Sequence, residues 1–189
     1  MFYSQSLILD QFTPVSIYEK VKKLFPDEIT FLFESVVNSS DGNFSYILIG
    51  DRERVWHKDK KSFHKNENGD IVEIDPNPFV FLKQYYKEID QELYKQKAQE
   101  LGIGLVDGFI GNIGYDMVCE FEPKLKAHMH DLEDTIGIAD FDLIRPKIIL
   151  GFSHKTSKLT LVTSMDEHKQ NLEAIKEELK SKGIKNTRA

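Results

Sequence analysis

Residues 29–50, ITFLFESVVNSSDGNFSYILIG, contain two apolar runs separated by a polar segment. The runs, roughly 29–37 and 44–50, have the length and the β-branched and aromatic content that strands favour. The polar segment between them, 38–43, contains an Asp-Gly pair and is typical of a turn. This stretch therefore predicts a β-hairpin, and with it antiparallel pairing of neighbouring strands.

The rest of the chain continues this pattern of paired strands. Asn68-Gly69 is a strong hairpin signal, and further strands are expected at 54–57, 106–114, 143–152 and 158–163. Helices are expected at 14–25 with Thr13 as N-cap, after Pro78, at 115–121, and at 166–182 with Asp166 as N-cap. Because strands do not alternate regularly with helices, the predicted fold class is α+β, a largely antiparallel β-sheet with flanking helices.

Composition narrows the classes of function. The formal net charge is −6 with acids and bases interspersed, which argues against nucleic acid as a partner because phosphate contacts need a basic surface. No stretch approaches the ~20 apolar residues that a membrane span needs. Cys119 is the only cysteine, so no intrachain disulfide and no Cys-x-x-Cys metal site can form. A cytoplasmic protein that does not contact a membrane is expected.

The glycines of 108–116, GFIGNIGYD, resemble a phosphate-binding loop only superficially. Their spacing is G-x-x-G-x-x-G, whereas a dinucleotide-binding loop has G-x-G-x-x-G, and no Gly-Lys-Ser/Thr follows. A glycine within a strand more often allows another backbone or side chain to come close. We therefore expect these glycines to have a structural use.

No catalytic or metal-binding residue is predicted from the residues themselves. His128 and His130 form a His-Met-His segment, but nothing nearby completes a ligand set with zinc spacing. The two histidines fall in 123–140, which lacks periodicity and is expected to form a long surface connection. Cys119 has no obvious activating base and is expected to pack in a helix.

Glu34 and Ser35 interrupt the apolar run of 31–37. In a strand, Phe31, Phe33 and Ser35 share one face, and Glu34 lies on the other between apolar neighbours, so we expect the strand to be covered on both sides. A buried carboxylate needs a cation or several donors. The pattern leaves two interpretations open. In one, Glu34 forms an internal salt bridge or lies at a solvated strand end. In the other, Glu34 binds a ligand ammonium while Ser35 and nearby backbone groups bind a ligand carboxylate or amide.

Several stretches, in order, resemble the N-terminal part of anthranilate synthase component I. Thr13-Pro14-Val15-Ser16 resembles the family's "TPVS/A" element, and 31–35, FLFES, resembles its "LLES" strand. Residues 46–50, YILIG, are similar to "YSFIG", and 108–116 resemble "GGFVGYFGYD", which is the most specific match. Residues 134–140, DTIGIAD, are similar to "DDLGLPD" with Ala139 in place of the usual proline, and 159–162 resemble the strand that closes this region.

The resemblance implies a role in tryptophan biosynthesis. The whole enzyme converts chorismate and ammonia, derived from glutamine, to anthranilate and pyruvate with Mg²⁺. The chorismate and Mg²⁺ residues of the family lie in a C-terminal chorismate-binding domain whose motifs are absent from this sequence. We therefore expect 1–189 to be a single N-terminal regulatory and partner-binding domain, inactive alone and without a metal site of its own.

The resemblance also implies a ligand and a partner. L-Tryptophan is the feedback inhibitor, and the residues carried over to its site are Phe33, Glu34, Ser35 and Ser45, the last at a position where many members have a basic residue. A glutamine amidotransferase subunit, component II, docks partly on this region in the family. Two alternatives stay open: the same region of aminodeoxychorismate synthase component I, of folate biosynthesis, and a free-standing ligand-binding module.

Overall fold

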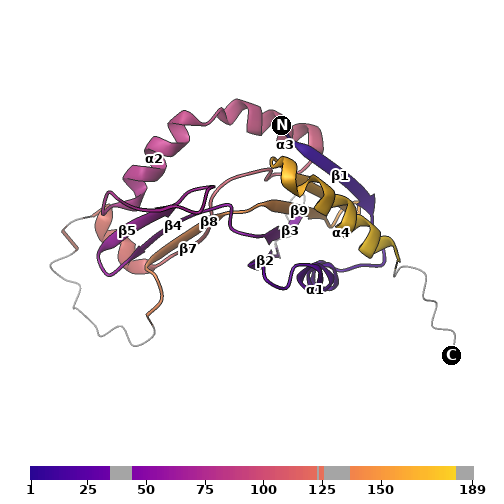
Figure 1. Ribbon diagram of the computed structural model, residues 1–189, viewed down its shortest axis with the longest axis horizontal. Helices are drawn as coiled ribbons and strands as arrows, with labels where there is room; N and C mark the ends of the chain where they lie inside the picture. Colours follow the sequence, from indigo (N-terminus) through magenta and orange to yellow (C-terminus); the bar gives the residue numbers. More distant parts are fainter. Residues whose placement is uncertain (35–43, 123, 126–136, 182–189) are drawn as a thin grey trace. The chain divides into compact units, whose positions relative to one another are not determined.

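The structure of this chain is a computed structural model that describes residues 1–34, 44–122, 124–125 and 137–181 (Figure 1). The chain divides into two compact units. Unit 1 comprises Met1–Asp51, Glu92–Gly108 and Pro146–Ala189, and unit 2 comprises Arg52–Gln91 and Phe109–Arg145. The grouping of both into the single domain predicted over 1–189 stays a prediction.

Unit 1 contains a five-stranded sheet, called here the first sheet, in which every neighbouring pair is antiparallel. The hairpin predicted from 29–50 supplies its two strands at one edge. In spatial order the strands are β1 (Tyr3–Ile8), β10 (Lys158–Thr163), β9 (Ile148–Ser153), β3 (Phe44–Ile49) and β2 (Thr30–Phe33). Because β9 arrives from a distant part of the sequence to pair with β3, residues more than 100 positions apart become neighbours.

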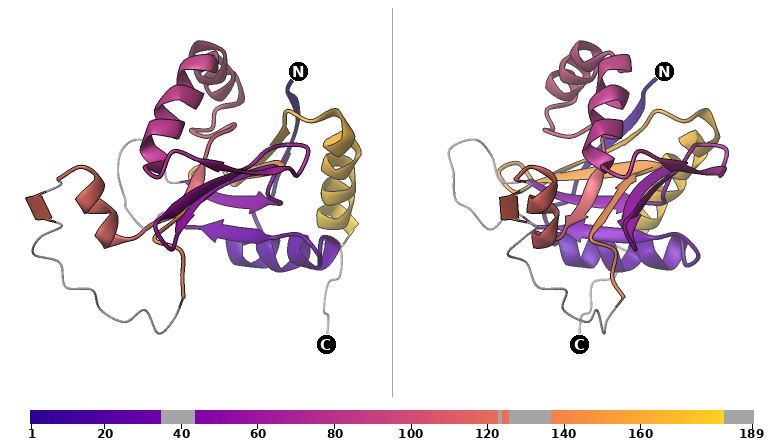
Figure 2. Two further views of the ribbon diagram at one scale, coloured as in Figure 1. Left: turned by 60° about the vertical axis from the view of Figure 1, so that its left-hand side comes forward. Right: turned by 90° about the vertical axis from the view of Figure 1, so that its left-hand side faces the viewer.

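Helices α1 (Pro14–Leu24) and α4 (Lys169–Ser181) cover one face of the first sheet and run in different directions, as Figure 2 shows with α4 in yellow. α1 begins at the predicted N-cap, where the Thr13 hydroxyl accepts a hydrogen bond from the Ser16 N–H and the Ser16 hydroxyl accepts one from the Thr13 N–H. Unit 1 also contains α3 (Gln91–Leu101), whose first residue belongs to unit 2.

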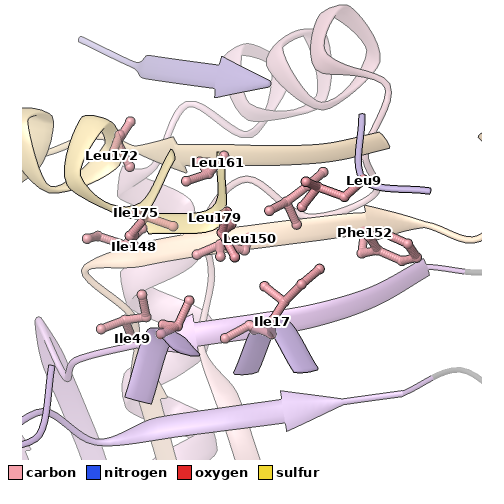
Figure 3. Packing of buried hydrophobic residues seen from close by; sticks show 13 residues of the cluster. Leu9, Ile17, Ile49, Ile148, Leu150, Phe152, Leu161, Leu172, Ile175 and Leu179 are labelled. Atoms are coloured by element: carbon pink, nitrogen blue, oxygen red, sulfur yellow. The ribbon is translucent and has the colours of Figure 1, made fainter. Parts of the chain in front are cut away.

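The core of unit 1 lies between the first sheet and these two helices (Figure 3). It is almost wholly aliphatic. Ile17 of α1, Leu150 of β9 and Ile175 of α4 are completely buried. Along the sheet, Ile49 and Ile148 lie at one end of this cluster and Phe152 at the other, so Phe152 marks the end at which β2 stops and β3 begins.

Unit 2 contains a second antiparallel sheet, with β6 (Ile71–Ile74), β5 (Lys61–Lys65), β4 (Glu53–Lys58), β8 (Phe141–Arg145) and β7 (Ile110–Ile113) in spatial order. Val55, Phe141 and Leu143 form its buried cluster together with Met117 of the 3-10 helix η1 (Tyr115–Glu120). Aromatic side chains of α2 (Pro78–Glu88) pack against this cluster. Gly69 joins β5 to β6 with a φ of 86°, as the Asn-Gly hairpin signal predicted.

The structure confirms the α+β class and the antiparallel pairing, and corrects three details. The single strand predicted at 143–152 is wrong: β8 and β9 belong to different sheets, because Pro146 has no N–H to donate to a ladder. Strand β1 was not predicted. Asp166 is not the N-cap of a helix; it begins the 3-10 turn η3 (Asp166–His168) and accepts a hydrogen bond from the Tyr3 hydroxyl. Within the described ranges, no helix is long and apolar enough to cross a bilayer.

Candidate functional site

The predicted ligand residues lie at the end of the first sheet where β2 stops and β3 begins. Phe33 is the last residue of β2 and pairs with Tyr46 of β3. Continued by one residue, this register puts Glu34 opposite Ser45. Ser35 lies outside the described residues. The hairpin therefore brings Glu34 and Ser45, eleven positions apart in the sequence, to neighbouring places on two paired strands.

The alternation of side chains assigns these residues to two faces. Leu32 packs on the core beneath α1 and α4, and so do Ile47 and Phe152. Ser45 is two residues from Ile47 and therefore faces the same side, as does Glu34 if the alternation of β2 continues past Leu32. Phe33 faces the opposite side. Glu34 and Ser45 thus share the helix-covered face, and Phe33 can contribute to the same site only through its backbone.

Phe31 and Phe33 occupy the other face of β2, and that face is open to solvent. The two residues are 39% and 40% exposed, and Glu34 is exposed as well. The expectation that β2 is covered on both sides is therefore wrong for this chain, because β2 is the last strand of the sheet and α1 and α4 cover only one face. The interpretation of Glu34 as half of an internal salt bridge loses its basis, since an exposed carboxylate needs no buried cation.

Ser45 has a partner that the sequence analysis did not single out. Ser45 is only 1% exposed, and its hydroxyl is hydrogen-bonded to Nε2 of His154, 2.8 Å away. His154 follows the end of β9 and is exposed, and its ring stands edge-on to the ring of Phe152. No local signal connects Ser45 to His154, since 109 residues separate them, and only the pairing of β3 with β9 brings them together.

The Ser45–His154 pair does not have the features of a nucleophile and its base. A catalytic serine must reach its substrate, and the base is normally oriented by a third group. Ser45 is buried, so its hydroxyl cannot reach a substrate, and His154 contacts that hydroxyl and the Phe152 ring. A metal site is not formed either: among the described residues, no group of three or more His, Cys, Asp or Glu side chains could hold an ion. The arrangement is suited to binding a small polar group.

The glycines of 108–116 have the structural use that the sequence analysis expected. A Cβ on Gly111 would overlap the carbonyl oxygen of Asp142 on the neighbouring strand β8, and a Cβ on Gly114 would lie 2.9 Å from the carbonyl oxygen of Asp140. Both glycines therefore allow β7 and the turn after it to pack tightly against another backbone. Cys119 is buried in η1. His128 and His130 lie outside the described residues.

A second polar cluster, buried in unit 2, was also missed. Glu53 and Arg145 are 3% and 5% exposed, and Glu53 Oε1 accepts hydrogen bonds from Arg145 Nη1 at 2.7 Å and from the Tyr85 hydroxyl at 2.5 Å. Its other oxygen is 2.9 Å from His64 Nε2. Burial raises the pKa of Glu53, but the hydrogen bonds from Tyr85, Arg145 and His64 together lower it more, so the pKa lies below its ordinary value. The cluster links β4, β5, β8 and α2. Because Glu53 and Arg145 are buried and hydrogen-bonded within the cluster, it does not offer a ligand-binding site.

Comparison with known proteins by sequence finds a relative. Over 163 residues, 84% of this chain, the sequence is 24% identical to anthranilate synthase component 1 of Bacillus subtilis strain 168. The chain is similar to anthranilate synthase component I. It spans 28% of the length of the curated relative that it matches. No family model matches the chain.

The comparison with solved structures finds a crystal structure of anthranilate synthase component I. The crystal structure of anthranilate synthase component I from Streptococcus pneumoniae TIGR4 covers 93% of this chain with a TM-score of 0.47 and 19% sequence identity, and the match takes in 35% of that structure's chain. The sequence comparison with the Bacillus subtilis protein extends over most of the chain, although the identity is low. It therefore agrees with the resemblance to the same family that was noted from 13–16, 31–35, 46–50 and 108–116.

Proposed function

We propose that this chain is the N-terminal part of an anthranilate synthase component I, which converts chorismate and ammonia to anthranilate and pyruvate. The observation that carries the proposal is the 163-residue match to the Bacillus subtilis protein of that name. In this proposal, as the resemblance implies, the catalytic chemistry with its Mg²⁺ belongs to a part of the enzyme that these 189 residues do not match. In this proposal the 189 residues alone do not turn over chorismate, and a glutamine amidotransferase subunit supplies the ammonia.

The regulatory part of the proposal is a binding site for L-tryptophan at the end of β2 and β3. Glu34 and Ser45 support it, because the register and alternation bring both to one end of the helix-covered face. In the proposed site the exposed Glu34 carboxylate pairs with the ligand ammonium, a charge-assisted contact. Phe33 and Ser35 are included because the resemblance carries them over to the site together with Glu34 and Ser45.

The test uses the isotope-labelled 189-residue chain and its amide NMR spectrum. L-Tryptophan is expected to shift amides near the end of β2 and the start of β3 saturably, with weak affinity because these 189 residues match only 28% of the relative's length. Glu34→Gln should weaken this binding. Its matched control, Glu73→Gln, changes an exposed carboxylate of β6 in the other unit and should leave tryptophan binding unchanged. Amide shifts that do not saturate, or that map elsewhere, would contradict the proposed site.

The catalytic part of the proposal has separate tests. The purified chain, incubated with chorismate, ammonia and Mg²⁺, is expected to give no fluorescent anthranilate, and anthranilate formation would show that the chain is active alone. The folate alternative is tested by complementation with the full-length gene. Rescue of a tryptophan auxotroph supports the proposal, whereas rescue of p-aminobenzoate synthesis alone would contradict it.

A further inference from the structure

His154 covers Ser45, a predicted ligand residue that a ligand cannot reach directly. Ser45 is 1% exposed, so its hydroxyl is not available to a ligand while the His154 ring lies against it. The ring itself is exposed. Any small molecule that binds at this end of the first sheet therefore meets the imidazole before the hydroxyl.

The three polar side chains lie on three adjacent strands. Glu34 follows β2, Ser45 is in β3, and His154 follows β9, in the spatial order β9-β3-β2. Adjacent strands are separated by about 4.8 Å, so Glu34 and His154 are placed on the two sides of Ser45. One side offers an anionic acceptor and the other an imidazole donor. This polarity matches a head group that has an ammonium and a carboxylate side by side, as an α-amino acid does.

The hydrogen bond to Ser45 prepares the imidazole for a carboxylate. If the Ser45 O–H donates to Nε2, then Nδ1 carries the ring hydrogen and is the nitrogen that can donate outward. Phe152 holds the ring from the side, with ring centroids 5.3 Å apart. The ring is thus held by two contacts from buried residues, which lowers the entropy lost when it binds a ligand.

We propose that His154 donates the hydrogen bond that binds the carboxylate of the amino-acid ligand, and that Ser45 acts through His154 as a positioning residue. This inference rests on the proposed function, in which that ligand is L-tryptophan. It assigns the ammonium to Glu34 and the carboxylate to His154, and so makes the two ends of the head group separately testable.

The test compares L-tryptophan with tryptamine, which lacks the carboxylate, by NMR titration of the 189-residue chain. His154→Ala should weaken tryptophan binding by about tenfold, the loss expected for a hydrogen bond to a charged group, and should leave tryptamine binding unchanged. His57→Ala is the matched control. His57 Nδ1 is likewise 2.8 Å from a serine hydroxyl, that of Ser62, but in unit 2, and its loss should not change tryptophan binding.

Ser45 is tested by a double-mutant cycle. Ser45→Ala should weaken tryptophan binding less than His154→Ala, and the double variant should bind no more weakly than His154→Ala alone, because Ser45 acts only through the imidazole. Additive losses would overturn the positioning role. An unchanged preference for tryptophan over tryptamine in a folded His154→Ala chain would overturn the inference while leaving the proposed site standing. If the unaltered chain shows no saturable tryptophan binding, the proposed regulatory site fails, and this inference fails with it.

Discussion

Glu53 shows how a single buried charge depends on its partners. Its carboxylate is surrounded by Arg145, Tyr85 and His64 and lies with Arg145 in the interior of unit 2. Removing one member of such a pair leaves the other charge buried and uncompensated, which costs about 3–5 kcal/mol. The group is therefore a sensitive point for the stability of unit 2, and protonation removes its charge without any mutation.

The free energy of unfolding should fall more steeply toward acid pH in the unaltered chain than in the Glu53→Gln variant. The pKa of Glu53 is lower in the folded state than in the unfolded chain, so the folded state takes up its proton less readily. The stabilisation is complete above the pKa of the unfolded chain and is lost as the pH falls through that of the folded state. Urea unfolding at a series of pH values should give a smaller decline for Glu53→Gln, which cannot titrate.

Its matched control is Glu73→Gln, whose carboxylate is half exposed in an ion pair with Lys61. That variant should keep the acid decline of the unaltered chain, because exposed pairs contribute little. Equal declines in Glu53→Gln and the unaltered chain would show that Glu53 does not contribute to the pH dependence.

At the scale of single residues, the sequence shows polar residues out of place but not their partners. Glu34 was conspicuous because it interrupts an apolar run, and Ser45 entered only through the family resemblance. Glu53, Arg145 and His154 could not be singled out, since each sits in a segment of mixed polarity and its partner is far away in the chain. Burial and pairing of such groups are set by strand order, which no local pattern encodes.

At the scale of elements, turn and capping signals were reliable where their physics is local. The Thr13 capping box and the Asn68-Gly69 hairpin are both formed. Strand continuity was not predictable from apolar character alone: 143–152 is apolar throughout except near Pro146, yet the chain passes there from the second sheet to the first. A proline inside a run of strand-forming residues was the signal that should have divided it.

Gly50, at the end of β3, should tolerate a side chain less well than Gly69. Both have positive φ, 74° and 86°, so alanine at either position should cost about 1–2 kcal/mol in backbone strain. A Cβ at Gly50 would also lie 2.5 Å from Lys147 Cδ and 2.9 Å from Glu28 Oε2, whereas nothing lies within 4 Å at Gly69. Gly50→Ala should therefore lose about 1–3 kcal/mol more in urea unfolding.

The larger loss of stability expected for Gly50→Ala has a specific origin, which a further variant can isolate. Lys147 Nζ is 2.7 Å from Glu28 Oε1, and the added methyl group would displace this ion pair. In a Lys147→Ala background the difference between Gly50→Ala and Gly69→Ala should largely disappear. A difference that persists there would assign the cost to the backbone of β3 instead of the ion pair.

At the scale of the whole molecule, the chain passes between the two units at four places, after 51, 91, 108 and 145. Each unit nevertheless has its own sheet and its own buried cluster, and the clusters found among the described residues share no member. Local stability follows the core on which an element packs. The units are thus expected to open separately, although neither is a continuous segment.

Two leucines on either side of Pro146 allow a matched test of this expectation. Leu143 belongs to the cluster of unit 2 and Leu150 to that of unit 1, and both are buried. Truncation to alanine should cost about 2–5 kcal/mol at either site. Native-state hydrogen exchange should then quicken mainly in β4, β5 and β8 for Leu143→Ala, and mainly in β3, β9 and β10 for Leu150→Ala. If each variant quickens exchange equally in both sheets, the chain unfolds as one cooperative body, because loss of either core then opens both.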